Sequence, residues 1–284
     1  MTTTNPSPDL LFEQVLTRLG FSERPAPTLQ GLRAVYAAWC RHIPFDNGRK
    51  LIHVRARDAR PFPGSMADDF FSAWLQHGTG GTCWSNAGAC HALLHWLGFD
   101  ARRGVATMLA APDIPPNHGT VCVRLDDADY LVDTSILHAE PLRLEHGQDS
   151  AQAHPAWGVQ GAWRDGRFHL GWRPLHKLDG FACRFERFGA SAQEFHDLHE
   201  QTRGWSPFNY EVNARRNRGD EVVGLAFGQA VTLHADGRVT QRPVDDAERR
   251  RILIEAIGLS EAIVNQLPAD SPTPPPPGSR LAGQ

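Results

Sequence analysis

Residues 78–99, GTGGTCWSNAGACHALLHWLGF, place Cys83 where a glycine-rich loop passes into a helix. The helix is predicted from Leu93, Leu94 and Leu97, which recur at helical spacing, and from the glycine that follows them. A thiol in the first turn of a helix meets the positive end of the backbone dipole, which favours the thiolate. The glycines let backbone N–H groups approach a substrate oxygen, as an oxyanion hole requires. Cys83 is therefore predicted to be the nucleophile of an acyl-transfer site. The alternative is a small cysteine buried after a tight turn.

A second segment predicts a base and a carboxylate for this thiol. Residues 117–125 alternate apolar and polar side chains as a strand does, a turn follows at 126–128, and residues 130–133 return as the partner strand. This hairpin brings Asp133 close to His118, so that the carboxylate can orient the imidazole that activates the thiol. Taken alone, the histidine could be a solvated edge residue and the aspartate a turn former. The order of helix cysteine, strand histidine and strand aspartate favours catalysis.

The composition is that of a globular protein. The chain has 284 residues, 41% of them hydrophobic and 21% charged, with a net charge of −3. It is long enough for one large domain or two to three small ones. The charge gives no reason to expect nucleic acid or an anionic membrane as a partner. No apolar run approaches the ~20 residues that span a bilayer, and the N-terminus has no apolar signal core. We therefore expect a cytoplasmic protein.

The cysteines and histidines form no metal or disulfide pattern. The five cysteines are odd in number and include no CxxC pair, which argues against a zinc knuckle and a disulfide framework. His91 with His95, and His196 with His199, have helical spacing but lack the glutamate of an HExxH motif. We expect no metal site and no permanently bound cofactor.

The periodicity changes along the chain. Residues 9–100 are mainly helical with proline-rich interruptions, and residues 101–178 consist of short alternating runs and turns. A helix is predicted over 191–202, two strands over 221–243 around an Asp-Gly turn, and a closing helix over 245–267. The proline-rich end of the chain has no apolar face to bury and is predicted to be disordered.

Four segments occur in order over most of residues 30–260. They are HIPFDN at His42–Asn47, GGTC at Gly80–Cys83 with LGF at Leu97–Phe99, His118 with Asp133 fifteen residues later, and SPF at Ser206–Phe208 followed by NARR at Asn213–Arg216. Together they resemble the arylamine N-acetyltransferase family. The set in this order is far more specific than any one segment.

The resemblance implies an α+β fold whose core is related to cysteine proteases and transglutaminases. The expected parts are a frayed tail (1–8), a cysteine-protease-like helical domain with the nucleophile (9–100), a β-barrel domain with the histidine and aspartate (101–190), an α/β lid (191–268) and a disordered proline-rich tail (269–284).

The resemblance also implies ping-pong N-acyl transfer to a small-molecule amine. The donor would be an acyl thioester of CoA or of an acyl carrier protein, acting as co-substrate. Cys83 would carry the acyl group, His118 would take the thiol proton, and Asp133 would hold the imidazole. The residues expected to contact the substrates are Phe45, which would wall the acceptor pocket, and Trp84, Thr120, Ser206 and Phe208.

Three positions depart from the family's pattern. Thr79 stands where an arginine usually precedes the glycine pair, Ser85 stands where a glutamate follows the cysteine, and residues 134–138 replace a glycine-rich turn. Because the replacements near the nucleophile are small, we expect an acyl group larger than acetyl to be preferred.

Two other functions are consistent with parts of the sequence. A transglutaminase-like amide hydrolase or peptidase would use the same thiol and hairpin, but it would not explain the HIPFDN and SPF segments. A non-catalytic homologue would bind a small molecule or a partner protein in the same pocket. A thioester adduct on Cys83 would separate the transferase from the binding protein.

Overall fold

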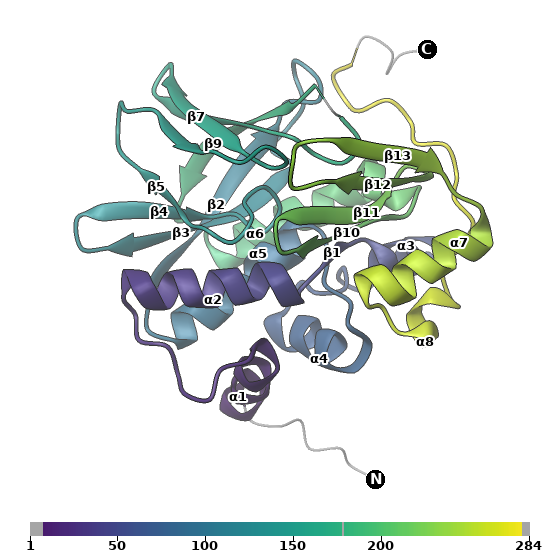
Figure 1. Cartoon of the computed structure of the whole chain (residues 1–284), viewed down its shortest axis with the longest axis horizontal. Coiled ribbons are helices and arrows are strands. Elements are labelled where there is room, and N and C mark those ends of the chain that lie inside the picture. The colour runs from purple at the N-terminus through teal and green to yellow at the C-terminus, as the bar shows by residue number, and fades with distance from the viewer. Residues whose placement is uncertain (1–7, 178, 280–284) are drawn as a thin grey trace.

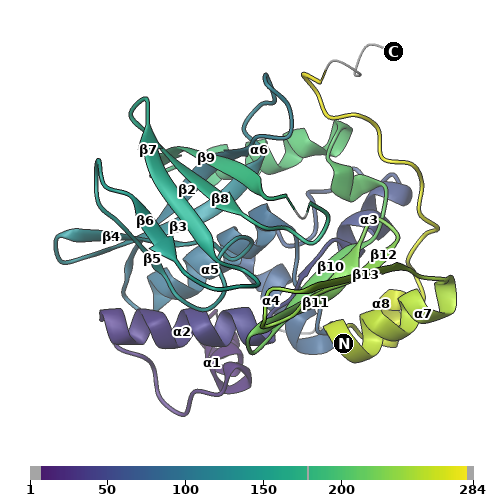
Figure 2. The same cartoon turned by 45° about the horizontal axis from the view of Figure 1, so that its top comes forward.

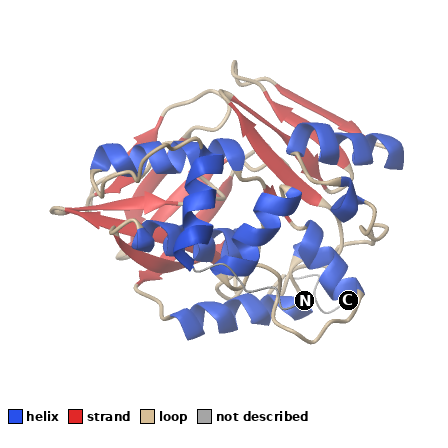
Figure 3. Cartoon of the chain, turned by 90° about the horizontal axis from the view of Figure 1, so that it is seen from below, coloured by secondary structure: helices blue, strands red, loops and turns tan. Residues whose placement is uncertain are grey.

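The computed structural model describes residues 8–177 and 179–279, which form two antiparallel sheets and a set of helices (Figure 1). Seen from below, helices lie in front of the strands (Figure 3). The α+β class expected from the sequence is confirmed. Within the described ranges, no helix is long and apolar enough to cross a bilayer.

Capping residues, a proline and a glycine set the ends of the N-terminal helices. They are α1 (Pro8–Leu19), α2 (Leu29–His42), α3 (Gly48–Arg55), α4 (Ala67–His77) and α5 (Cys83–Trp96). The Thr28 hydroxyl accepts the Gly31 N–H and caps α2. That helix ends just before Pro44, because a residue ahead of proline disfavours helical backbone. At the end of α4, Gly78 has a φ of 69° and turns the chain into the glycine loop.

The larger sheet curls into a nearly closed barrel (Figure 2). Its strand order is β5-β4-β3-β2-β9-β8-β7-β6, and the edge strands β5 and β6 lie close together. The strands are β2 (Asp100–Met108), β3 (His118–Leu125), β4 (Ala128–Val132), β5 (Leu142–Leu144), β6 (Ser150–Gln152), β7 (Val159–Arg164), β8 (Arg167–Trp172) and β9 (Phe181–Phe188). The predicted hairpin is confirmed, since β3 pairs with β4 through a tight turn in which Asp126 has a φ of 50°.

The smaller sheet has the order β1-β10-β11-β12-β13. Its strands are β1 (Phe45–Asp46), β10 (Asn213–Arg218), β11 (Glu221–Ala226), β12 (Gln229–Leu233) and β13 (Val239–Pro243). The accompanying helices are α6 (Ala192–Gln201), two short turns (Thr202–Gly204 and Pro207–Asn209), α7 (Asp246–Arg251), a π-helical turn (Ile252–Ile257) and α8 (Glu261–Val264). Although β1 lies in the segment predicted to be helical, it pairs with β10 and joins the N-terminal helices to this sheet.

Two predictions for the C-terminal region are wrong in detail. Residues 221–243 form three strands rather than two, because a turn at Phe227 and Gly228, both with positive φ, separates β11 from β12. The single helix expected over 245–267 is broken at Gly258, which has a φ of 94° and ends the π-helical turn.

One hydrophobic core runs through the helical region and the barrel. Helix α5 lies within it, packed against α4, β2 and β3. Because α5 is covered on several sides, its buried residues surround it instead of forming a single stripe. This burial fixes the N-terminus of α5, and with it Cys83, relative to the start of β3.

The proline-rich end differs from the disordered tail expected over 269–284. The Asp270 carboxylate accepts the Val212 N–H at 2.9 Å, and the Thr273 hydroxyl donates to the Glu211 carboxylate at 2.8 Å. These bonds join Asp270 and Thr273 to the residues just before β10, and disorder of the rest of the segment stays a prediction.

The remaining parts of the predicted domain division are not tested by the structure. Residues 1–7 of the frayed tail predicted for 1–8, and residues 280–284, fall outside the described residues. The domain boundaries at 100, 190 and 268 stay a prediction, and the shared core crosses the first two of them.

Candidate active site

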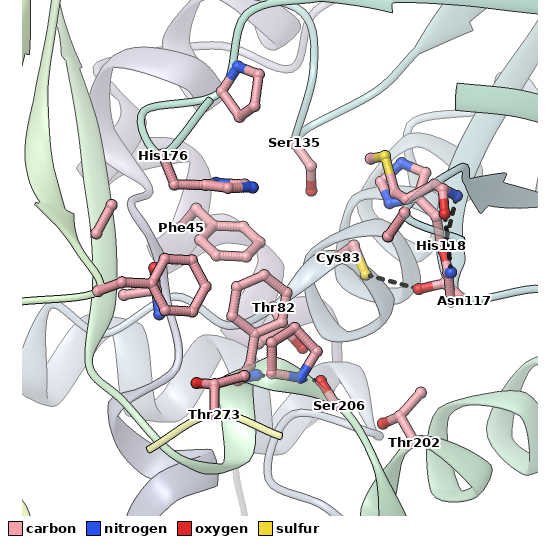
Figure 4. Close-up of a pocket in the computed structure, with 18 of the residues that line it drawn as sticks. Phe45, Thr82, Cys83, Asn117, His118, Ser135, His176, Thr202, Ser206 and Thr273 are labelled. Atoms are coloured by element: carbon pink, nitrogen blue, oxygen red, sulfur yellow. Dashed lines mark hydrogen bonds between the residues drawn. The ribbon is translucent and has the colours of Figure 1, made fainter. Parts of the chain in front are cut away.

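The predicted triad residues come from three elements that meet in the interior. Cys83 begins α5, His118 begins β3, and Asp133 directly follows β4. The Nε2 atom of His118 lies 2.7 Å from Oδ2 of Asp133, and both side chains are buried, with 1% and 0% exposed. The Cys83 thiol donates to the Asn117 carbonyl oxygen at 3.8 Å, and the adjacent His118 ring lowers the pKa of the thiol. Figure 4 shows Cys83 and His118 side by side at the cavity.

The electrostatics of these groups favour an ion pair. Burial raises the pKa of Cys83, but the hydrogen bond and charge of His118, the Gly119 N–H and the charge of Lys50 outweigh it, so the pKa lies below its usual value. Burial lowers the pKa of His118, but the charge and hydrogen bond of Asp133 and the Cys83 thiolate raise it to about 10. A thiolate beside an imidazolium at neutral pH follows from these opposite shifts.

The other four cysteines lack this activation. Burial raises the pKa of Cys40 to about 11 and that of Cys122 to about 12, and it also raises the pKa values of Cys90 and Cys183 well above the ordinary value. Of the five cysteines, Cys83 is the one whose thiolate is favoured. Within the part of the chain that the structure describes, no three His, Cys, Asp or Glu side chains are grouped to hold a metal ion.

Asp133 is fixed by hydrogen bonds to both its carboxylate and its backbone. Its Oδ1 atom accepts the N–H groups of Ser135 and Ile136, each at 2.9 Å. Its carbonyl oxygen accepts the Tyr36 hydroxyl at 2.6 Å. Burial raises the pKa of this carboxyl, but the charge and hydrogen bond of His118 bring it below the ordinary value. The carboxylate is therefore ionised and held in one orientation.

Asp46, to which sequence reasoning gave no role, fixes the glycine loop before the nucleophile. Its carboxylate accepts the Gly80 N–H at 2.6 Å and the Thr79 hydroxyl at 3.0 Å. A Cβ atom at position 80 would lie 1.9 Å from the Pro44 carbonyl oxygen, so only glycine allows this close approach. Thr79, one of the departures from the family's pattern, proves to be in contact with Asp46.

The loop places backbone N–H groups around the sulfur. The Asn86 side-chain amide donates to the Gly81 carbonyl at 2.5 Å and holds the loop against α5. N–H groups in the first turn of a helix have no carbonyl partner within the helix, and Cys83 is the first residue of α5. The Gly119 N–H contacts the sulfur from β3. A Cβ at this glycine would lie 2.7 Å from the Trp84 ring. This arrangement can stabilise a negatively charged oxygen beside Cys83.

The nucleophile opens into a cavity of about 280 Å³. Four of the five residues predicted to contact substrate line it: Phe45, Trp84, Ser206 and Phe208. The rings of Phe45 and Phe208 are in contact, with centroids 5.3 Å apart, so the HIPFDN and SPF segments form one wall. Thr120 is the exception. Residues two apart in a strand share a face, so Thr120 points with His118 toward Asp133, whose pKa it helps to lower.

Sequence reasoning missed two cations in the cavity wall, Lys50 of α3 and Arg215 of β10. Arg215 was noted only as part of the NARR segment, and no pattern marks Lys50. Thr79 and Ser85, both described residues, lie outside the lining. The lining therefore gives no support for selection by size at these two positions, and the preference for a larger acyl group stays a prediction.

The helix-borne cysteine, the histidine that begins the β3–β4 hairpin and the aspartate that follows it have the geometry of a nucleophile, a base and an orienting carboxylate. A family model described as N-acetyltransferase matches residues 28–261. The arylamine N-acetyltransferase of Mycolicibacterium smegmatis is 30% identical over 178 residues, which cover 57% of this chain and 62% of that relative. The chain belongs to the arylamine N-acetyltransferase family.

Solved structures of the family share the fold. An arylamine N-acetyltransferase from Mycobacterium abscessus superposes with a TM-score of 0.76 at 19% identity, covering 91% of this chain and 94% of that one. The enzyme from M. smegmatis gives 0.74 at 21% identity, with 89% and 96% covered. A Mycobacterium marinum arylamine N-acetyltransferase in complex with CoA gives 0.73 at 22% identity, with 90% and 96% covered.

Proposed function

We propose that the protein is an N-acyltransferase that moves an acyl group from an acyl thioester to a small-molecule amine through a thioester on Cys83. The observation that carries the proposal is the array in which Cys83 contacts His118, itself 2.7 Å from Asp133. Membership of the family supports amine acylation over the hydrolase and binding-protein alternatives.

CoA is the proposed carrier of the acyl group. The support is the M. marinum structure, which has the same fold and is described in complex with CoA. An acyl carrier protein presents the same thioester and is the second candidate donor. An aromatic amine is the proposed acceptor, since the M. smegmatis relative is an arylamine N-acetyltransferase.

The first half-reaction loads Cys83. Its thiolate attacks the donor's carbonyl carbon, and the oxygen becomes negatively charged beside the N–H groups of Cys83 and Gly119. When this intermediate collapses, the bond between the carbonyl carbon and the donor sulfur breaks. The His118 imidazolium gives its proton to the leaving thiolate and becomes neutral, while Asp133 keeps the ring in place.

The second half-reaction transfers the acyl group. A neutral amine attacks the thioester carbonyl, and the neutral His118 ring takes a proton from the amine nitrogen. The bond between carbon and the Cys83 sulfur then breaks, which releases the amide and a thiolate. The thiolate–imidazolium pair is restored, so no external acid or base is consumed.

Intact-mass measurement tests the proposal. Incubation with acetyl-CoA should add one acetyl group, peptide mapping should place it on Cys83, and an aromatic amine should discharge it. The Cys83→Ala variant should give no adduct. Cys90→Ala, two helical turns further along α5, is the matched control and should load normally.

Two results would contradict N-acyl transfer. An adduct that water discharges as fast as the amine does would indicate a hydrolase. No adduct with any CoA or carrier-protein thioester would indicate a binding homologue.

A further inference from the structure

Lys50 is a buried cation in the wall of the cavity. It lies in α3, is 6% exposed, and lines the same cavity as Cys83. Its Nζ atom lies 4.6 Å from the centroid of the Phe62 ring and donates to the Thr202 hydroxyl at 2.9 Å. That hydroxyl donates its own proton to the His199 carbonyl at 2.7 Å, so it serves Lys50 as an acceptor.

The hydrogen-bonding capacity of this ammonium group is largely unused. An ammonium has three N–H donors, and the hydrogen bond to Thr202 occupies one. The carboxylate of Glu200 acts on Lys50 through its charge, but its oxygens accept the Phe62 N–H and the Arg203 guanidinium, each at 2.6 Å. In the described part of the chain, no carboxylate forms an ion pair with Lys50. A buried charge with free donors is costly unless a ligand meets it.

Apart from the Cys83 thiolate, the charged side chains that line the cavity in the described part of the chain are positive, like Lys50. Among the described lining residues none is Asp or Glu, and Arg215 is a second cation. Arg215 already donates to the Ser135 carbonyl, and its guanidinium lies over two aromatic rings. In Figure 4, Ser135 and Thr202, the hydrogen-bond partner of Lys50, lie on opposite sides of Cys83. The cavity that Cys83 lines therefore holds one engaged cation, Arg215, and one with free donors, Lys50.

Acylation changes the charge balance at Lys50. The Cys83 thiolate is the largest charge effect that favours the Lys50 ammonium, and Lys50 in turn favours the thiolate. Formation of a thioester removes that negative charge and leaves the ammonium without its partner. An acyl group that ends in a carboxylate would restore the balance and use the free N–H donors.

We propose that the Nζ atom of Lys50 binds a substrate carboxylate carried by the acyl group, so that half-thioesters of dicarboxylic acids are preferred to neutral acyl thioesters of the same size. The inference rests on the proposed acyl transfer through Cys83 and names the chemical class of its donor. A carboxylate on the amine acceptor has the same chemistry, and the experiment separates the two sources.

The donor arm compares malonyl-CoA with isovaleryl-CoA, in which an isopropyl group replaces the carboxylate. Intact-mass measurement gives the second-order rate constant for loading Cys83 with each. We expect the wild type to favour malonyl by about 10- to 100-fold, Lys50→Met to lose the preference, and Lys50→Arg to keep most of it. Lys177 is the chain's only other lysine and is exposed. The control variant Lys177→Met should behave as the wild type.

The acceptor arm starts from the acetyl-loaded protein and compares 4-aminobenzoate with 4-aminobenzamide. A preference that depends on Lys50 here, and is absent from the donor arm, would overturn the assignment to the acyl group. If the ratio of the malonyl-CoA to the isovaleryl-CoA loading rate constant is the same in the wild type and in Lys50→Met, Lys50 does not bind a substrate carboxylate and the proposal is overturned. Failure of every thioester to load wild-type Cys83 is a different result, which refutes the proposed function.

A measurement on the wild type does not depend on the folding of any variant. Burial lowers the pKa of Lys50 to about 8, and the charge of Arg203 adds to this effect. The charges of the Cys83 thiolate and Glu200 act in the opposite direction and raise the pKa. Burial also keeps the neighbouring His199 neutral by lowering its pKa. Titration of the nucleophile affects both donors and cancels in their ratio. The malonyl-to-isovaleryl ratio should therefore fall as the pH rises through 8, and a constant ratio would contradict the proposal.

Discussion

Replacing Asp133 with asparagine tests whether this residue orients His118 or only forms a turn. In the wild type, Oδ1 accepts the N–H groups of Ser135 and Ile136, and Oδ2 faces Nε2 of His118. The single oxygen of asparagine can serve only one of these sets. If it stays with the backbone, the amide NH₂ points at Nε2, and the neutral ring must carry its proton on Nδ1. That nitrogen then cannot accept a proton from Cys83.

The substitution also removes the charge that raises the pKa of His118 to about 10. An adjacent opposite charge changes a pKa by about 1 to 3, which corresponds to about 1.4–4 kcal/mol. Because the imidazolium lowers the pKa of Cys83, the thiol should then titrate nearer its usual value of 9.0. The same exchange in the serine-protease triad lowers turnover by about 10⁴-fold. We expect a loss of about 10²- to 10⁴-fold here.

Two assays measure the effect of Asp133→Asn: acyl transfer at neutral pH, and iodoacetamide alkylation of Cys83 as a function of pH. The alkylation profile should move to higher pH while circular dichroism and thermal unfolding remain those of a folded protein. Asp129→Asn is the matched control, because Asp129 lies on the same hairpin and pairs with Arg102. A folded Asp133→Asn protein with the turnover and alkylation profile of the wild type would refute the reasoning.

Three further predictions follow from the contacts. Iodoacetamide should label Cys83 before the other thiols and should lose rate only as the pH falls through its lowered pKa; earlier labelling of another cysteine would contradict this. Deleting residues 269–284 should lower the melting temperature by about 2–8 °C, because the bonds of Asp270 are lost; an unchanged value would favour a disordered tail. Gly80→Ala should slow loading, since its Cβ would meet the Pro44 carbonyl, and a normal rate would show that the loop relaxes.

Local patterns were enough to predict the elements that carry the triad. The glycine loop followed by regularly spaced leucines predicts the helix that begins at Cys83, and strand alternation around an acidic turn predicts the hairpin. Once that hairpin forms, its register brings Asp133 near His118. The packing of this hairpin on α5 is non-local, and only the order of the family's motifs pointed to it.

Other features depend on partners far away in the sequence. The helix predicted over 245–267 breaks at Gly258, where the chain meets the end of α4 and the Ser260 N–H donates to the His77 carbonyl at 2.8 Å. The proline-rich end is likewise held by hydrogen bonds to residues 210–212. Periodicity and composition describe what a segment can bury by itself, so they do not reveal contacts of this kind.

Lys50 shows the same limit at the site itself. In the sequence it is one polar residue of a helical stretch, and its meaning arises because α3 brings it into a cavity wall that also holds Cys83. The departures at Thr79 and Ser85 suggested selection of the acyl group by size, but neither residue reaches the cavity. If Cys83 is acylated as we propose, the Lys50 ammonium loses the thiolate charge that favours it. Charge on the acyl group is therefore the property on which we expect this cavity to select.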